Sequence, residues 1–407
     1  MEIKWTKATA NVHCKVIEEE ALEQIKTICN YTAMEWCNIE IMPDAHSWKG
    51  CVIWFTSTIW DKIIPNLVWV DIGCWMAYVK FEYDWKIDFD WLDKYIRENI
   101  PCWFNIRNEA ISDFSFVDFN CKSIDKDRAL KSIWTLWWWN HFIEIDKDDE
   151  WYYYLVIHSW SRYLWKQICE YYQDLASKRY SKDIIIEWKT LQEWIDYLKK
   201  KWEQKNIQEC VEMFRKARNY VLEDLGDNKN LTYLEWEDKD NYIKDASICQ
   251  NFARKNREAM ITIILKYLAH WIKWDTWIIK HTIHNYIDLR DWVIRKWAIR
   301  NDEECLIPIN MRDWAFIVSR KDDMKWKWNN SLPHWAGRLM SRNKARESIW
   351  LDEYKKSMEW IRSSCVVEST IDESPMAYKS IDDIKEVIEE VCIIKKHIKP
   401  IYNFKAE

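Results

Sequence analysis

Glycine is almost missing from this sequence, which has 4 Gly and 32 Trp among 407 residues. Average usage would give roughly 28 Gly in a chain of this length. Glycine is the residue that adopts positive φ in tight turns without steric cost. Many of the Trp lie in turn contexts, as in MRDWA, RKWA, HSWSR and PHWAG. We therefore predict that most of these Trp stand where the source organism has glycine, encoded by UGA codons that have been read as Trp.

Features that would indicate a membrane, secreted or broadly basic protein are also missing. No apolar run is long enough to span a bilayer. The first residues, MEIKWTKATANVHC, lack the apolar core of a signal peptide. The 13 Cys have no tight spacing pattern, which favours a reducing compartment over a disulfide framework. The net charge of −6 excludes a basic footprint over the whole molecule, so a nucleic-acid surface would be a local patch. We predict a cytoplasmic protein.

The pattern of apolar strands and amphipathic helices predicts an α+β fold. We expect a single large mixed α/β domain over residues 1–407, with central β-sheets and outer helices. Neither linkers nor internal repeats divide the chain, although composition alone equally fits a two-domain α/β enzyme. Residues 181–225, rich in Lys and Glu with an apolar stripe, predict a helical insertion, which we hypothesise to be a partner-docking arm.

The stretch PNLVWVDIGCWM, residues 65–76, is the centre of the predicted site. It is expected to be a strand followed by a tight turn that directs Asp71 and Cys74 toward one point. His141 follows a run of three Trp, and His158 ends an apolar strand. Acid, thiol and imidazole groups at strand ends are consistent with a metal site, although a lone buried Cys is more often a small hydrophobic residue.

Two further motifs carry polar groups. In SLPHWAGRLMSR, His334 is predicted to precede a helix start, with Arg338 and Arg342 one turn apart. A helix N-terminus with two arginines can bind phosphate, and a surface basic helix is the alternative. Asp44 and His46 follow a strand as Asp-x-His, which is either a catalytic pair or a turn capped by its own side chains, and we assign them no role.

Taken together, the motifs resemble one family, the RtcB-type RNA ligases. The matching elements, in chain order, are MPDAHSWKG, PNLVWVDIGCWM, WTLWWWNHFIE, HSWSR, TIHNYI, RKWA, NMRDW, PHWAGRLMSR and YNFKA. The family carries Gly at the matching Trp positions, as in VGVDIGCGM and PHGAGR. The literal sequence would press Trp75, Trp137–Trp139, Trp160 and Trp335 into the site.

The resemblance implies a GTP- and Mn²⁺-dependent ligase that joins RNA 3′-phosphate or 2′,3′-cyclic phosphate ends to 5′-hydroxyl ends, in tRNA splicing or RNA repair. It implies that His334 attacks GTP and becomes guanylylated. The side chains it implies are, for two Mn²⁺ ions, Asp71, Cys74, His141, His158 and His284; for the guanine nucleotide, Asn140, Glu144, Arg338, Tyr378 and Lys405; and for RNA phosphates, Arg162, Lys296 and Arg342. The ligand types alone also admit Zn²⁺ or Fe²⁺, so Mn²⁺ rests on the resemblance.

Two other functions stay open at this point. A metal-dependent phosphoesterase would use the same cluster without a covalent histidine. An RNA-binding protein without chemistry is expected if the Trp residues are literal. The partners that the resemblance implies are RNA ends, and it leaves open a separate activating protein.

Overall fold

The computed structural model describes residues 2–4, 6–14, 17–43, 45–48, 50–68, 72–83, 87–111, 114–116, 118–137, 140–161, 163–177, 231–269, 272, 278–302, 304–334 and 337–406. Helices and several β-sheets are present, which confirms the α+β prediction. Residues 181–225 lie outside the described residues, so the helical insertion stays a prediction. No helix in the described part combines the length and the apolar character needed to cross a bilayer.

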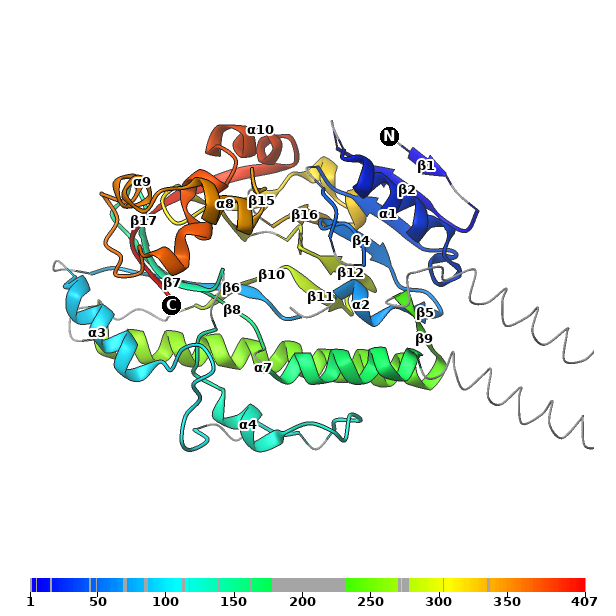
Figure 1. Ribbon diagram of the computed structural model, residues 1–407, viewed down its shortest axis with the longest axis horizontal. Coiled ribbons are helices and arrows are strands. Elements are labelled where there is room, and N and C mark those ends of the chain that lie inside the picture. Colours follow the sequence, from blue (N-terminus) through cyan, green and yellow to red (C-terminus); the bar gives the residue numbers. More distant parts are fainter. Residues whose placement is uncertain are drawn as a thin grey trace, which may run out of the picture.

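A seven-stranded sheet forms the centre of the molecule (Figure 1). Each neighbouring pair in it is antiparallel. Its strands, in spatial order, are β10 (Lys280–Ile283), β6 (Trp75–Phe81), β8 (Tyr153–Ser159), β7 (Phe142–Lys147), β17 (Cys392–Lys405), β15 (Ala315–Arg320) and β14 (Cys305–Pro308). This sheet carries most of the predicted site residues on its strands or directly beside them.

A second sheet of six strands contains the N-terminal part of the chain. It is antiparallel except for the β2–β3 pair. Its order is β1 (Glu2–Lys4), β2 (Thr9–Val12), β3 (Asn38–Ile41), β4 (Phe55–Thr58), β12 (Val293–Lys296) and β11 (Asn285–Asp288). Two short ribbons pair β13 (Ala298–Arg300) with β16 (Ser331–Pro333), and β5 (Lys62–Ile63) with β9 (Leu234–Glu235).

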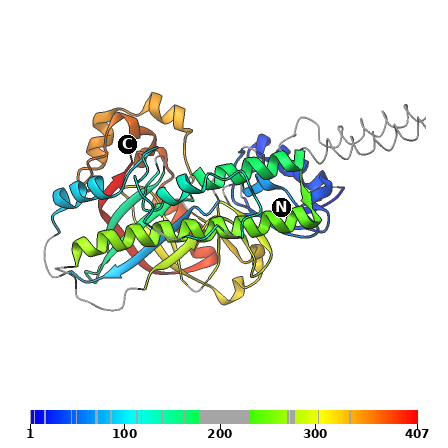
Figure 2. The same cartoon turned by 90° about the horizontal axis from the view of Figure 1, so that it is seen from below.

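The helices lie on both sides of the sheets (Figures 1 and 2). The long helix α7 (Trp236–Leu268) runs beneath them, and residues 163–177 form a further helical segment. The other helices are α1 (Glu19–Asn30), α2 (Pro65–Val68), α3 (Phe89–Asn99), α4 (Lys126–Lys131), α8 (Arg342–Ser348), α9 (Leu351–Ser357) and α10 (Ile381–Val391). Short 3₁₀ turns are η1 (Thr32–Met34), η4 (Asp322–Met324), η5 (Lys327–Asn329), η6 (Glu368–Glu373) and η7 (Pro375–Ala377).

Both faces of the central strands are buried. On β6, Ala77 and Val79 belong to the core that α7 covers, whereas Met76 and Tyr78 face residues of β14, β15 and β17. Strands buried on both faces are expected to be apolar almost throughout. Helix α7 also reaches the core of the six-stranded sheet through Phe252, so one helix supports both sheets.

Three local predictions were wrong. Residues 65–68 form the helix α2 instead of a strand, with Pro65 at the first position, where a missing N–H costs nothing. Residues 121–136, whose sequence pattern predicts one helix, are helical only over α4, Lys126–Lys131. No helix starts beside His334, because α8 begins at Arg342 and is capped by Ser341, whose Oγ accepts a bond from the Lys344 N–H.

Candidate active site

The strand register gathers four predicted ligands at one end of the seven-stranded sheet. His158 in β8 pairs with Met76 of β6 on one side and with Phe142 of β7 on the other. Cys74 therefore lies immediately before the first residue of β6, and His141 immediately before the first residue of β7. On the other side of β6, Ile283 pairs with Trp75, and the His284 N–H donates to the Cys74 carbonyl at 3.3 Å.

These side chains form a compact cluster, the histidine cluster, of Cys74, His141, His158 and His284. The Cys74 Sγ lies 3.0 Å from the His158 Nε2 and 3.3 Å from the His141 Nε2. The Nε2 atoms of His158 and His284 are 3.4 Å apart. Ligand atoms from Cys74, His158 and His284 all lie within 4.8 Å of one another. A single cation can therefore contact a thiolate and two imidazoles here.

Burial keeps the imidazoles of His158 and His284 neutral. It lowers the pKa of His158 to about 3 and lowers the pKa of His284 well below its usual range. The His158 Nδ1 lies 2.9 Å from the Asn140 carbonyl oxygen. A ring nitrogen that donates to a carbonyl fixes the tautomer with a lone pair on the other nitrogen. The Nε2 of His158 thus faces the cluster as a metal ligand would.

Helix α7 supports the cluster from beneath. The fully buried Arg257 donates from Nη1 to the carbonyls of Gly73 at 3.1 Å and Ser159 at 2.6 Å. Those two residues adjoin Cys74 and His158. Gly73 has φ +70°, and a Cβ there would come within 3.1 Å of the Ala253 Cβ. Arg257 therefore holds the chain on which two of the ligands sit.

His334 lies directly against this cluster. Its ring stacks on that of His284 with centroids 3.5 Å apart and planes 13° apart, and it lies 6.0 Å from the ring of His158. It follows β16, whose pairing with β13 brings Pro333 beside Ala298. Burial lowers the pKa of His334 well below its ordinary value. The imidazole is therefore neutral, as a nucleophilic histidine must be.

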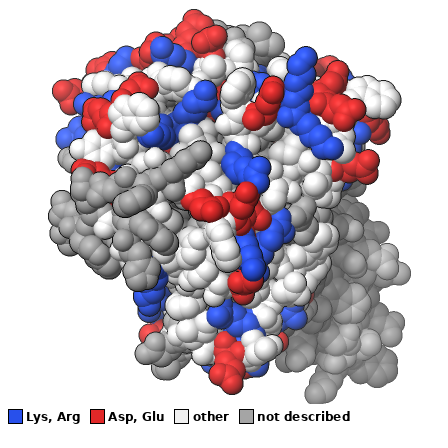
Figure 3. All heavy atoms as spheres, turned by 90° about the vertical axis from the view of Figure 1, so that its left-hand side faces the viewer, with Lys and Arg blue, Asp and Glu red and all other residues white. Residues whose placement is uncertain are grey.

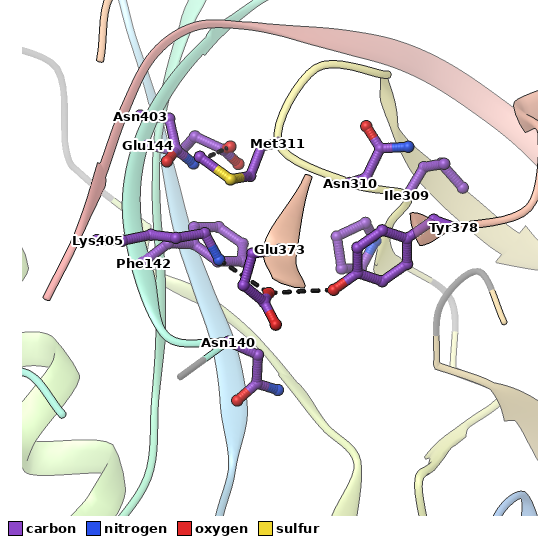
Figure 4. A pocket seen from close by; sticks show the side chains of 11 residues that line it. Asn140, Phe142, Glu144, Ile309, Asn310, Met311, Glu373, Tyr378, Asn403 and Lys405 are labelled. Carbon is purple, nitrogen blue, oxygen red and sulfur yellow. Dashed lines mark hydrogen bonds and ion pairs between the residues drawn. The ribbon is translucent and has the colours of Figure 1, made fainter. Parts of the chain in front are cut away.

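A polar pocket adjoins the histidine cluster (Figure 4). It is lined by Asn140, Phe142, Glu144, Pro308, Ile309, Asn310, Met311, Glu373, Tyr378, Asn403 and Lys405. Asn140 joins the two regions, because its backbone carbonyl contacts His158 while its side chain lines the pocket. Among the described residues, the buried Asn140 Nδ2 and Asn403 Oδ1 have no hydrogen-bond partner. One donor and one acceptor are thus available to a bound molecule.

Glu373 is the ionic centre of this pocket. Its Oε2 lies 3.1 Å from the Lys405 Nζ and accepts a bond from the Tyr378 hydroxyl at 3.0 Å (Figure 4). Its Oε1 lies 2.5 Å from the Arg342 Nη1 and 3.5 Å from the Arg338 Nη1. Although burial opposes ionisation, Lys405 and the two arginines hold the pKa of Glu373 well below its usual range. The carboxylate is therefore charged.

Glu144 differs from Glu373 in its charge state. It is buried on β7, and its Oε1 accepts a hydrogen bond from the Asn403 Nδ2 at 2.6 Å. Burial raises the pKa of Glu144 to about 8, against the lowering effects of Asn403 and Lys405. Near neutral pH this carboxyl group is mostly protonated, so it can donate as well as accept a hydrogen bond.

The other predicted residues are less closely tied to this centre. Asp71, Arg162 and Asp44 lie outside the described residues, so their roles stay predictions. Lys296 is buried on β12 and donates to the Cys51 carbonyl at 2.7 Å, and burial lowers its pKa to about 8. His46 lies edge-on to Trp54 with ring centroids 5.5 Å apart.

Sequence reasoning missed Glu373 and Arg257. The sequence signal for Glu373 was its place five residues before Tyr378, in IDESPMAY. Arg257 lies on a helix whose other residues indicated only packing.

The described residues on the face of the molecule in Figure 3 have basic and acidic side chains interspersed, with no single basic patch among them.

Residues 117–406 match the profile of a protein family described as tRNA-splicing ligase RtcB. The match covers more than half of the chain. This chain belongs to the RtcB family. RNA-splicing ligase RtcB1 of one Escherichia coli strain is 26% identical over 442 residues, covering 96% of both proteins. RNA-splicing ligase RtcB of Escherichia coli K12 is 25% identical with the same coverage. The tRNA-splicing ligase RtcB of Nanoarchaeum equitans is 24% identical over 330 residues, covering 72% of this chain and 64% of that protein.

Proposed function

We propose that this protein is an RNA ligase that joins RNA 3′-phosphate or 2′,3′-cyclic phosphate ends to 5′-hydroxyl ends, using GTP and two Mn²⁺ ions. Family membership supports the ligase class. The single observation that carries the mechanism is the stacking of His334 on His284, at 3.5 Å, beside a thiol and imidazole cluster. This contact supports the assignment of His334 as a neutral nucleophile beside a site for cations. We expect this chemistry to take place in the cytoplasm.

The donor set of the histidine cluster fits a divalent transition metal. Cys74, His158 and His284 converge, and the Asn140 carbonyl fixes the tautomer of His158. We assign His141 and Asp71 to the same ligand set. A bound cation would neutralise charge on phosphate oxygens during phosphoryl transfer.

The covalent steps use His334. A ring nitrogen attacks the α-phosphorus of GTP, the N–P bond forms, and pyrophosphate leaves. A 2′,3′-cyclic end is first opened by water to a 3′-phosphate. An oxygen of this RNA 3′-phosphate then attacks the GMP phosphorus and releases His334. Finally the 5′-hydroxyl of the second RNA attacks the activated 3′-phosphate, and GMP leaves.

The polar pocket suits the guanine nucleotide. The unpartnered atoms of Asn140 and Asn403 and the carboxyl of Glu144 offer hydrogen bonds to a base. Lys405, Tyr378 and Arg338 meet at Glu373 on the other side of the pocket. We assign Arg338 to the nucleotide phosphates, and Arg342, Arg162 and Lys296 to RNA phosphates. The protein contributes mainly orientation and charge neutralisation.

Covalent labelling tests this proposal. The protein is incubated with Mn²⁺ and GTP radiolabelled at the α-phosphate, then denatured and counted for retained label. We expect label on the wild type and none on His334→Ala, with His397→Ala as a control because His397 packs against Trp314 and Phe316, outside the cluster. Label retained by His334→Ala would overturn the assignment. Loss of terminal phosphate from RNA without any labelling would indicate a phosphoesterase instead.

A further inference from the structure

Tryptophan occupies backbone positions that suit glycine. Among the described residues, twelve non-glycine residues have positive φ, and ten of these are Trp. They are Trp36, Trp54, Trp103, Trp134, Trp151, Trp236, Trp292, Trp297, Trp326 and Trp328. Their φ values lie between 49° and 71°. A Cβ is disfavoured in this left-handed region, where a bulky residue is an outlier and glycine is not.

The environments of the Trp side chains are equally unusual. Within the part of the chain that the structure describes, eleven of the 18 exposed large hydrophobic residues are Trp, and Trp36 and Trp326 are 79% and 72% exposed. Three buried Trp, at positions 54, 75 and 160, have an indole N–H without an acceptor among the described residues. A buried indole N–H usually finds a partner. Thus the exposed rings gain little free energy from burial, and the three buried rings lack a hydrogen bond.

We propose that the protein made in its source cells has glycine at these ten positive-φ positions, and that the same replacement applies at the active site. The ring of Trp297 stacks against His284 with centroids 5.7 Å apart, and that of Trp160 stacks against His141 at 5.9 Å. Glycine at these two positions opens space beside the ligands for nucleotide and RNA ends. This inference concerns the composition of the chain and does not depend on the proposed function.

Mass spectrometry of the natural protein decides it. Trypsin cleaves after Lys327 and Arg338, which releases the peptide WNNSLPHWAGR with Trp328, His334 and Trp335. Protein isolated from cells of the source organism is expected to give GNNSLPHGAGR. Trp at position 328 would overturn the proposal. Sequencing the coding DNA is a second arm, with UGA codons expected at the ten positions and UGG codons counting against the proposal.

Glu373 supports a second, independent inference. We infer that Glu373 is a positioning residue that fixes both ends of the nucleotide pocket, an assignment that rests on the proposed function. Its two oxygens contact Lys405 of β17, Arg342 of α8, and Arg338 and Tyr378, which face each other in an isolated β-bridge. It is fully buried behind them and ionised.

The geometry explains why one carboxylate is needed. Arg338 also donates to the Tyr378 hydroxyl at 3.1 Å, and its guanidinium lies 4.9 Å from the centre of the Tyr378 ring. Two arginines and a lysine would repel one another in a buried pocket without an anion between them. Glu373 holds these cations at a fixed spacing before nucleotide arrives. Neighbouring Asp372 cannot replace it, because its carboxylate contacts Arg342 and Arg346 but no group of the Lys405 side.

Glu373→Gln keeps the size of the side chain and removes its charge. We expect the GTP concentration for half-maximal labelling of His334 to rise at least roughly tenfold, which is the effect expected when a supporting hydrogen-bond partner is removed. The rate of GMP transfer from preformed labelled protein to RNA should change much less. Glu373→Asp should restore part of the GTP affinity, and Glu368→Gln, an exposed residue of the same 3₁₀ segment, should match the wild type.

Two results would contradict this role. An unchanged half-maximal GTP concentration in Glu373→Gln would show that the carboxylate does not position the nucleotide site. An equal loss in GTP affinity, transfer rate and Mn²⁺ affinity, together with a lower melting temperature, would show a purely structural role. If the wild type takes up no label, the proposed function fails first and this inference fails with it.

Discussion

The histidine cluster and the polar pocket meet at Asn140, yet they differ in the charge of the side chains that form them. The cluster has neutral donors, with burial lowering the pKa values of His158, His284 and His334. The pocket has charged groups that neutralise one another around Glu373. The neutral donor atoms of the cluster are therefore suited to binding a cation. The cations of the pocket are already paired with Glu373.

The two regions also differ in how they are held. The ligands of the cluster sit at strand ends of one antiparallel sheet, where register fixes them. The pocket joins β7 and β17 to η6 and to the segment around Tyr378. We conclude that hydrogen-bonded register positions the residues of the proposed metal site, whereas side-chain ion pairs position those of the proposed nucleotide site. The predictions below separate these two modes of construction.

The largest effect is expected from removing the thiolate. Cys74→Ala should lower metal affinity by more than the roughly 10- to 100-fold cost of losing an outer-shell partner. Binding of Mn²⁺ is measured by calorimetry and compared with Cys392→Ala, a buried cysteine in another core cluster. Unchanged Mn²⁺ affinity in Cys74→Ala would remove Cys74 from the ligand set. GTP binding without metal should change little, since the pocket is held separately.

Acid should destabilise the cluster before the pocket in metal-free protein. The folded pKa of His158 is about 3, and the unfolded value is about 6.5. Between these values His158 takes up a proton in the unfolded chain but not in the folded chain. The contribution of this histidine to the free energy of unfolding is therefore fully present above pH 6.5 and falls as the pH drops. The slope is about 1.4 kcal/mol per pH unit for each such histidine.

The depressed pKa of Glu373 affects stability in a lower pH range. Its contribution to the free energy of unfolding is lost only below the pKa of about 4.3 that a glutamate has in the unfolded chain. Urea unfolding at pH 7, 6 and 5 checks the difference. His284→Gln should flatten the decline in this range, and Glu373→Gln should not. Equal slopes in wild type and His284→Gln would mean that the cluster is not protonated on unfolding.

A smaller effect is expected from Arg257, which supports the cluster through backbone carbonyls. Arg257→Leu removes the donors to Gly73 and Ser159, and Mn²⁺ affinity should fall about tenfold. The half-maximal GTP concentration should stay near that of the wild type, since Arg257 lies outside the pocket lining. A shift in GTP affinity alone would contradict the division between the two regions.

The smallest effect is expected at Trp326, whose side chain is 72% exposed and whose φ is 70°. Trp326→Gly should stabilise the protein by about 1 kcal/mol, because it removes a Cβ from the left-handed region. Trp91, in the first turn of α3 and 60% exposed, is the matched control with a helical backbone. Trp91→Gly should destabilise by up to about 1 kcal/mol, since glycine is a poor helix former. Both changes are measured by urea unfolding.

Sequence patterns predicted the helix–strand content and the motifs around His141, His158 and His334, because each lies in a short local segment. The α2 helix escaped prediction, since a segment as short as PNLV fits either structure. The segment WVIRKWAI, residues 292–299, has the pattern of one strand, but it is divided at Trp297, where positive φ separates β12 from β13. For Glu373 the sequence offered only its position five residues before Tyr378, because its partners Arg338 and Lys405 become neighbours only through tertiary folding.

The pairing of β8 between β6 and β7 would couple the proposed metal binding to correct strand register during folding. Shifting β8 by one residue would exchange His158 for Ile157 or Ser159 and turn the imidazole to the other face of the sheet. A misaligned chain therefore loses a ligand at once, and only correctly aligned molecules gain the free energy of cation binding. The ion that serves the reaction would thereby also select the β-sheet that carries it out.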